Sequence, residues 1–250
     1  GERGTIFCTR DGGNEWEEIS LEEDVGLNDI VFIDEAQYIE NIGLYLKMLV
    51  DLMPEKIFIV TGSSSFNISG AVSEPLTGRN ICRVLFPISV LELKKQIDNT
   101  KIIGRLEEYL IFGMYPEIFS FNSINEKVEY LISLRNSYLF KDILALENIR
   151  NSSRMTDILK LLAFQMGSEI SINEISRKIG IAKATIEKYL DLLEKAFVIK
   201  KIGSFSRNLR NEIAKSAKYY FYDNGIRNAL INNFNPLKDR DDIGKLWENF

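Results

Sequence analysis

DIVFIDE, residues 29–35, is the stretch of sequence that decides the fold of the N-terminal part of the chain. Its β-branched and aromatic residues form an unbroken run that ends in two adjacent carboxylates. Such a run is typical of a strand buried on both faces of a parallel sheet. A similar run, KIFIVTG at residues 56–62, ends in small polar residues. The apolar spacing between the runs predicts a helix over residues 38–53, followed by Pro54.

Strand, helix and strand in this order predict a βαβ unit with a right-handed crossover, and therefore an α/β fold. Ligands of such sheets bind at the carboxyl ends of the strands, which meet at one edge. We therefore expect Asp34, Glu35 and residues 61–65 to share that edge.

The carboxylates Asp34 and Glu35 fit the chemistry of nucleotide hydrolysis. P-loop ATPases use an Asp at such a strand end to hold Mg²⁺, and a Glu beside it to polarise the attacking water. The sequence thus predicts Asp34 as the metal and cofactor ligand and Glu35 as the catalytic residue, with ATP and Mg²⁺ as cofactors. The neighbouring strand offers cofactor-binding candidates near the γ-phosphate: Thr61, Ser63 and Ser64. The alternative is a strand that exits into an acidic turn.

Arg79, in the segment LTGRN, is a further catalytic candidate. An arginine at an oligomer interface can stabilise transition-state charge on the phosphates of a neighbouring subunit. The alternative role for Arg79 is a surface or structural ion pair.

The middle of the chain is predicted to be mostly helical. ICRVLF, residues 81–86, indicates one more strand, and periodic apolar positions then predict amphipathic helices over residues 88–165. The polar string RNSSR at residues 150–154 indicates a linker to another domain.

A helix-turn-helix pattern follows this linker. Ser171 and Glu174 are spaced as a capping box that starts a short helix, and Gly180 ends it. A longer amphipathic helix is predicted over residues 183–196. Two predicted strands, FVIKKIG and KYYFYD, then flank a basic loop that would be a wing.

Charge is divided unevenly along the chain. Residues 1–150 carry 14 basic and 24 acidic side chains, whereas residues 151–250 carry 17 and 12. A basic helix-turn-helix favours contact with DNA phosphates and bases. The predicted DNA-binding residues are Lys183, Thr185, Lys188, Lys200, Lys201, Arg207 and Arg210. The alternative is a module for packing or oligomerisation with a protein partner.

Composition excludes several classes of function. The chain contains no histidine, which removes Ser-His-Asp and Cys-His catalysis and His-ligated metals. Two cysteines make no disulfide framework, and no apolar run approaches the length of a membrane span. We therefore expect a cytoplasmic protein with no membrane partner.

The order of motifs resembles a prokaryotic AAA-type ATPase family. The matching segments, in chain order, are IVFIDEAQYI, IFIVTGSSS, LTGR, PISVLEL, GMYPEI, YLFKDIL, the helix-turn-helix, YYFYDNGIRNAL and GKLWENF. The resemblance implies a parallel-sheet P-loop NTPase core with a helical lid, followed by an α+β winged helix-turn-helix domain. It also implies Asp34 and Glu35 as the Walker B pair.

The resemblance implies four parts with boundaries near residues 87, 150 and 222. These are a partial ATPase core over residues 1–87, a lid over 88–150, a winged helix over 151–222 and the start of a C-terminal domain over 223–250. In this family the C-terminal domain resembles restriction endonucleases. Asp223 and Glu248 are the only candidates here for such a metal site, so we expect no nuclease activity from this chain.

The chain departs from the family because it contains no GxxxxGK(S/T) loop to cradle the phosphates. We expect a sequence shortened at both ends, since it begins at Gly1 and closes on GKLWENF, the start of a helix. The chain as written should bind nucleotide weakly or not at all. In intact form the protein is expected to hydrolyse Mg·ATP and to switch contacts with DNA or a protein partner, as a homo-oligomer or otherwise. The alternatives are a DNA-binding or scaffold protein with a vestigial nucleotide fold, and a protein adaptor.

Overall fold

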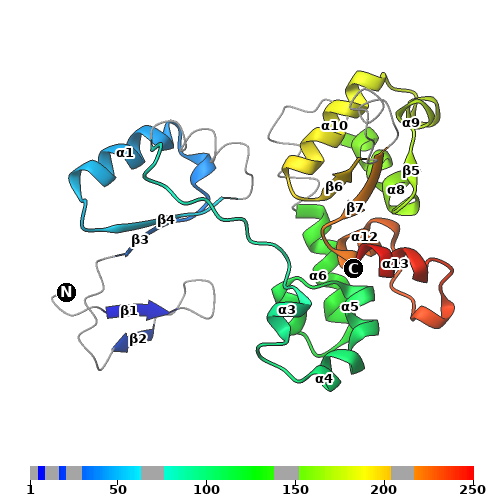
Figure 1. Cartoon of the computed structure of the whole chain (residues 1–250), viewed down its shortest axis with the longest axis horizontal. Coiled ribbons are helices and arrows are strands. Elements are labelled where there is room, and N and C mark those ends of the chain that lie inside the picture. The colour runs from blue at the N-terminus through cyan, green and yellow to red at the C-terminus, as the bar shows by residue number, and fades with distance from the viewer. Residues whose placement is uncertain (1–4, 9–16, 21–29, 63–75, 138–151, 204–216) are drawn as a thin grey trace. The chain divides into compact units, whose positions relative to one another are not determined.

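The computed structural model of the chain describes residues 5–8, 17–20, 30–62, 76–137, 152–203 and 217–250. The chain divides into two compact units, Gly1–Cys82 and Arg83–Phe250 (Figure 1). Within the described ranges, no helix is both long and apolar enough to cross a membrane.

The first unit contains a parallel pair of strands, as predicted. β3 (Ile30–Ile33) pairs with β4 (Ile57–Val60) from Ile30↔Ile57 to Ile33↔Val60, so both strands end at the same level. The 3-10 helix η1 (Ala36–Tyr38) and α1 (Ile42–Leu52) connect them. A second, antiparallel pair joins β1 (Thr5–Cys8) to β2 (Glu17–Ser20).

Among the described residues, side chains cover only one face of the β3–β4 pair. Ile42 and Leu46 of α1 form a small core with Ile33 and Val60, whereas Phe32 on the opposite face is 59% exposed. The prediction that these strands are buried on both faces is therefore wrong for this chain.

Residues 81–86 do not form the predicted strand. They carry no regular secondary structure, and Leu85 is 96% exposed. A β-branched run becomes a strand only when a neighbouring strand accepts its backbone hydrogen bonds, and none does so among the described residues.

The second unit is mostly helical up to residue 164, as expected. Its first helices are α3 (Val90–Leu93), α4 (Asn99–Gly104), α5 (Leu106–Phe112), η2 (Pro116–Phe119), α6 (Ile124–Leu134) and α8 (Ser152–Phe164). The remaining elements are β5 (Glu169–Ile170), α9 (Ile172–Ile179), α10 (Lys183–Lys195), β6 (Ile199–Ile202), β7 (Ala217–Phe221), α12 (Asn224–Ile231), η4 (Leu237–Asp239) and α13 (Ile243–Asn249).

The α9–α10 pair has the boundaries that the sequence predicted. The Ser171 hydroxyl accepts a hydrogen bond from the Glu174 backbone N–H at the start of α9, and Gly180 ends the helix with φ of 76°. The face of α10 that carries Ile186 and Leu193 is buried. β5, β7 and β6 then form an antiparallel sheet in that order.

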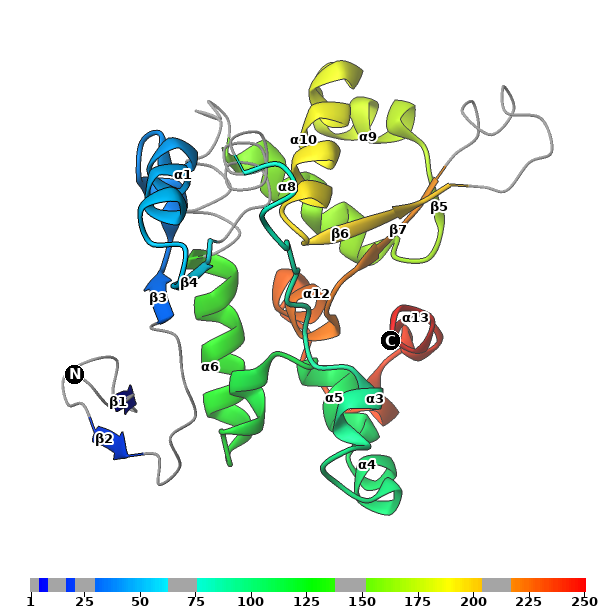
Figure 2. The ribbon, with the colours of Figure 1, turned by 60° about the vertical axis from the view of Figure 1, so that its left-hand side comes forward.

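α12 joins the parts of the second unit into one core. It contacts α5, α6, α8 and β7 and lies between the β6–β7 strands and α5 (Figure 2). Its residues 224–230 are all buried, and one apolar cluster runs from Leu110 on α5 to Leu246 on α13. Described residues of the segments 88–150, 151–222 and 223–250 thus share this core.

A buried ion cluster fixes the chain after α12. The guanidinium of Arg227 donates to Asp242 and, through Nε, to the Ala163 carbonyl at 2.8 Å. Arg240 Nε donates to the same carboxylate at 2.8 Å. Burial by itself would raise the pKa of Asp242, but the hydrogen bonds from Arg240 and Arg227 outweigh it and lower the pKa to about 2.

Asp223 caps α12 and also binds the turn after α5. Its Oδ1 accepts from the Ile226 backbone N–H at 3.0 Å, and its Oδ2 accepts from the Met114 N–H at 2.7 Å. Gly113 lies directly beneath the carboxylate with φ of 76°, and a Cβ there would lie 2.1 Å from Oδ1. A side chain at Gly113 would therefore push apart two elements that the carboxylate joins.

Replacing Gly113→Ala should reduce the free energy of unfolding by at least about 3 kcal/mol, because positive φ and a collision act together. The comparison is Gly180→Ala, whose φ is also 76° but whose ψ of 36° is ordinary left-handed backbone, with open space around the Cβ; it should cost about 1 kcal/mol. Denaturant unfolding of both variants measures the difference. Equal losses of unfolding free energy in the two variants would show that Asp223 and the turn after α5 separate without an energetic cost.

Replacing Asp242→Asn should change the acid dependence of stability. Since the folded pKa of Asp242 is about 2 and its ordinary value is 3.8, its contribution is present above pH 4 and is lost as pH falls toward 2. The stability gap between wild type and variant should therefore narrow by about 2 kcal/mol over that interval. Asp239→Asn, at an exposed position, is the control and should follow the wild type. A constant gap measured by urea unfolding would contradict the assignment.

Candidate functional site

Asp34 and Thr61 lie together at the ends of β3 and β4. The Thr61 hydroxyl donates a hydrogen bond to Asp34 Oδ1. The Thr61 backbone N–H donates to the Ile33 carbonyl at 2.9 Å, and the Ala36 N–H donates to the Thr61 carbonyl at 2.9 Å. The predicted meeting of these two polar residues at one sheet edge is confirmed.

Glu35 turns the chain sharply at this edge. Its backbone is left-handed, with φ of 49° and ψ of 42°, and it is the N-cap of η1. This conformation costs a non-glycine residue about 1 kcal/mol or more, and such strain gathers at functional sites. Both Asp34 and Glu35 are exposed, so their carboxylates are accessible to a ligand.

The donor chemistry of this edge suits a hard cation held partly by its substrate. Thr61 occupies Asp34 Oδ1, which leaves Oδ2 available toward a metal or its water. In the described residues, no group of three or more Asp, Glu, Cys or His side chains surrounds one point. Mg²⁺ needs no such group, because it is usually bound by one or two carboxylates, waters and substrate phosphates. Asp34 therefore fits Mg²⁺ that arrives with a nucleotide.

The structure places the other predicted nucleotide-site residues as follows. Ser63 and Ser64 lie outside the described residues. Arg79 forms an ion pair with Asp51 of α1, with Nη1 2.5 Å from Oδ1, and both side chains are nearly half exposed. The alternative that the sequence left open for Arg79, an ion pair, is therefore present in this structure.

The predicted DNA-binding residues in the described ranges lie on α10 and β6. Lys183, Lys188, Lys200 and Lys201 are exposed and Thr185 is half-buried, whereas Arg207 and Arg210 lie outside the described residues. Acidic residues of α10 are engaged locally. Asp191 pairs with Lys195 at 2.8 Å, and Glu194 accepts from the Lys201 backbone N–H at 3.1 Å. The Asp191–Lys195 pair offsets one charge of each sign on α10, and Glu194 keeps its charge beside the Lys201 backbone.

Asp223 and Glu248, the two nuclease candidates, both have structural partners. Asp223 is buried beneath the turn after α5, and burial raises its pKa to about 6. Glu248 accepts hydrogen bonds from Tyr220 at 2.6 Å and Lys218 at 3.1 Å, which join α13 to β7. The sequence did not reveal the partnership of Asp223 with Met114, since 109 positions separate the two residues.

Comparison with known proteins agrees with the α/β nature of the first unit. Residues 10–94 match the family described as "AAA domain". Residues 103–237 match the family described as "Domain of unknown function (DUF8612)".

The chain is also similar to several curated proteins. It is 26% identical over 251 residues to an uncharacterized protein of Mycobacterium tuberculosis, which covers 97% of this chain and 55% of that protein. It is 27% identical over 209 residues to an uncharacterized protein of Haemophilus influenzae, and this alignment covers 80% of this chain and 52% of that protein. The chain thus spans about half the length of the curated relatives it matches. A solved Walker-type ATPase of Pyrococcus abyssi aligns with a TM-score of 0.46 and 19% identity, over 81% of this chain and 63% of that one.

The chain is thus mixed α/β and helical, and its N-terminal part, over residues 10–94, is similar to an AAA domain. The chain belongs to the DUF8612 family, since that match covers more than half of its residues.

Proposed function

We propose that this chain is the Walker B part of an AAA-type ATPase that hydrolyses Mg·ATP. The observation that carries the proposal is the Thr61–Asp34 hydrogen bond at the carboxyl ends of two parallel strands, within the segment that matches an AAA domain. Polar groups at this edge are where nucleotides bind in open α/β sheets.

Each residue of the edge has a proposed role. Thr61 fixes one Asp34 oxygen, so that the other faces Mg²⁺ or its water. Mg²⁺ would neutralise the charge that develops on the phosphates. Glu35 accepts a proton from, or orients, the attacking water. The sequence contains no phosphate-binding loop, and binding of the nucleotide phosphates requires a segment of the GxxxxGK(S/T) type.

Arg79 is proposed to act in a neighbouring subunit of a homo-oligomer. Its exposed ion pair with Asp51 is of the kind that contributes only about 0–1 kcal/mol. Release of Arg79 toward a phosphate is therefore inexpensive. If the nucleotide fold is vestigial, the protein has no ATP turnover, and substitutions of Glu35 or Arg79 change none.

Glu35→Gln in the natural-length protein should lower kcat for ATP at least about 100-fold, because the glutamine no longer accepts the proton of the attacking water. Nucleotide affinity should be retained. The control is Glu40→Gln, which removes a nearby exposed carboxylate and should leave kcat unchanged. A wild-type protein without turnover would favour the vestigial fold, and full activity in Glu35→Gln would exclude Glu35 as the catalytic residue.

We also propose that residues 152–221 form a winged helix that contacts DNA. The order α8, β5, α9, α10, β6, β7 and the sheet order β5-β7-β6 support this. Exposed Lys183 and Lys188 on α10 and Lys200 on β6 provide positive charge on its surface. In the intact protein, nucleotide hydrolysis would switch these contacts, or contacts with a protein partner.

The double variant Lys183→Gln and Lys188→Gln should weaken binding of duplex DNA about tenfold and reduce the slope of log affinity against log salt by about 1 to 2. Fluorescence anisotropy at several salt concentrations measures both. The charge-matched control is Lys94→Gln with Lys95→Gln, two exposed lysines after α3. If both double variants lose affinity equally, the effect is one of net charge. DNA affinity that is absent at low salt would favour the adaptor role.

A further inference from the structure

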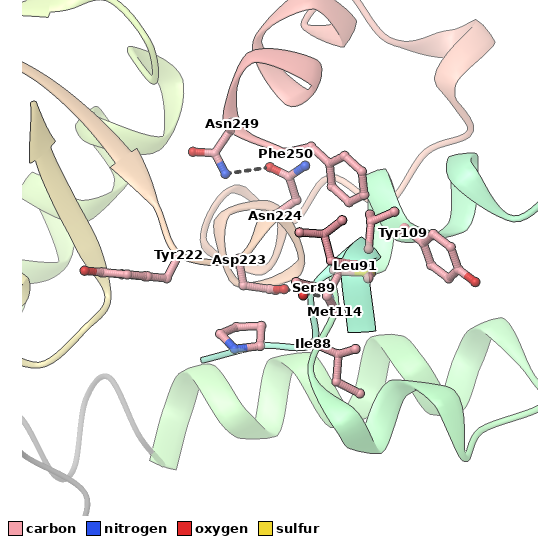
Figure 3. A pocket seen from close by; sticks show the side chains of 13 residues that line it. Ile88, Ser89, Leu91, Tyr109, Met114, Tyr222, Asp223, Asn224, Asn249 and Phe250 are labelled. Atoms are coloured by element: carbon pink, nitrogen blue, oxygen red, sulfur yellow. Dashed lines mark hydrogen bonds between the residues drawn. The ribbon is translucent and has the colours of Figure 1, made fainter. Parts of the chain in front are cut away.

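The second unit contains a cavity of about 290 Å³ that has no role in the proposed function. It lies where residues 87–91 meet the turn after α5, the start of α12 and the end of α13 (Figure 3). Apolar side chains of Ile88, Leu91 and Met114 line it, together with the rings of Tyr109 and Tyr222. The volume is at the lower limit of pockets that take small organic molecules.

Among the polar side chains that line the cavity, the buried Tyr109 hydroxyl has no hydrogen-bond partner in the described part of the chain, whereas the two asparagine amides are engaged. Asn249 Nδ2 donates to Asn224 Oδ1 at 2.9 Å and to the Phe221 carbonyl at 3.0 Å. Asn224 Nδ2 donates to the Leu246 carbonyl at 3.1 Å. Of the described residues that line the cavity, none is a lysine or arginine. An anionic ligand would therefore find no cation in this described wall, and the Tyr109 hydroxyl can accept a hydrogen bond from an ammonium as well as donate one.

Asp223 gives the same wall a carboxylate without a cationic partner. The group is buried, and among the described residues its hydrogen bonds come from backbone N–H groups, including those of Met114 and Ile226. A carboxylate accepts about four hydrogen bonds, so it has capacity for a further donor. Aromatic rings beside it add faces that attract a positive charge.

We propose that this cavity binds a small alkylammonium group, whose N–H donates to Asp223 while its chain contacts Ile88, Leu91 and Met114. The inference is independent of the nucleotide site, because every lining residue belongs to the second unit. A charge-assisted hydrogen bond in a desolvated site supplies the selectivity. The ammonium group belongs to a free amine or to a lysine side chain.

The test is a titration of the 250-residue chain with n-butylammonium chloride, followed by NMR of the Gly113, Met114 and Gly225 amides. Saturable shifts with a dissociation constant on the order of 1 mM are expected for a ligand of this size. n-Butanol, which has the same chain and no charge, should bind at least about tenfold more weakly. Butyrate should not bind. Equal binding of butanol, or no saturation with butylammonium, would overturn the proposal.

Two variants connect binding to the cavity. Asp223→Asn should weaken butylammonium binding at least about tenfold, but it also alters the cap of α12. Leu91→Trp enlarges a side chain that lines the cavity and is 72% exposed, so it should fold normally and lose binding. Leu52→Trp, at a similarly exposed position of α1 in the first unit, is the matched control and should bind like the wild type. Unchanged binding in Leu91→Trp would place the ligand elsewhere.

A last arm distinguishes the two sources of the ammonium group. Nα-acetyl-lysine methylamide, which presents the same group on a peptide, should bind as well as butylammonium if the cavity takes a protein lysine. Binding that is tenfold weaker would assign the cavity to a free amine. Either result supports an alkylammonium site.

Discussion

Asp223 is the carboxylate on which the arrangement of the second unit depends. It accepts hydrogen bonds from Ile226 in α12 and from Met114 after α5, so one side chain fixes the start of one helix against the end of another. The Met114 carbonyl in turn accepts from the Ile88 N–H at 2.8 Å. The segment that enters the unit is thereby joined to the same point. These bonds hold the first turn of α12 inside the unit, where residues 224–230 are all buried.

The two units use carboxylates in opposite ways. Asp223 is desolvated and its pKa is raised to about 6, so its charged form is costly in the folded protein. Asp34 is exposed, and among the described residues the hydrogen bond to its carboxylate comes from the Thr61 hydroxyl. A buried carboxylate of the first kind holds one geometry and can accept only a donor that enters the cavity beside it, while an exposed one of the second kind is open to a hydrated ion. This difference in access is why nucleotide chemistry is proposed for the first unit.

Local patterns predicted much of this structure. The DIVFIDE run, its parallel partner and the Ser171–Gly180 cap signals gave correct elements, because hydrophobic period and capping act over a few residues. The prediction of a strand at residues 81–86 was wrong, because a strand forms only beside a neighbouring strand and the local sequence does not show whether one is there. The buried cluster of Arg227, Arg240 and Asp242 was also missed. In the sequence, each of these residues resembles an ordinary surface charge, because the burial of Arg227 depends on the packing of α12.

The contact between Glu194 and β6 has a consequence for the behaviour of the protein in solution. β6 is at the edge of its sheet, where outward N–H groups can recruit a strand from another molecule. The Glu194 carboxylate of α10 accepts the Lys201 N–H and places negative charge along that edge. Two adjacent lysines on the strand add mutual repulsion between copies. The helix that is proposed to meet DNA thus also occupies one backbone donor at the edge of the sheet beside it.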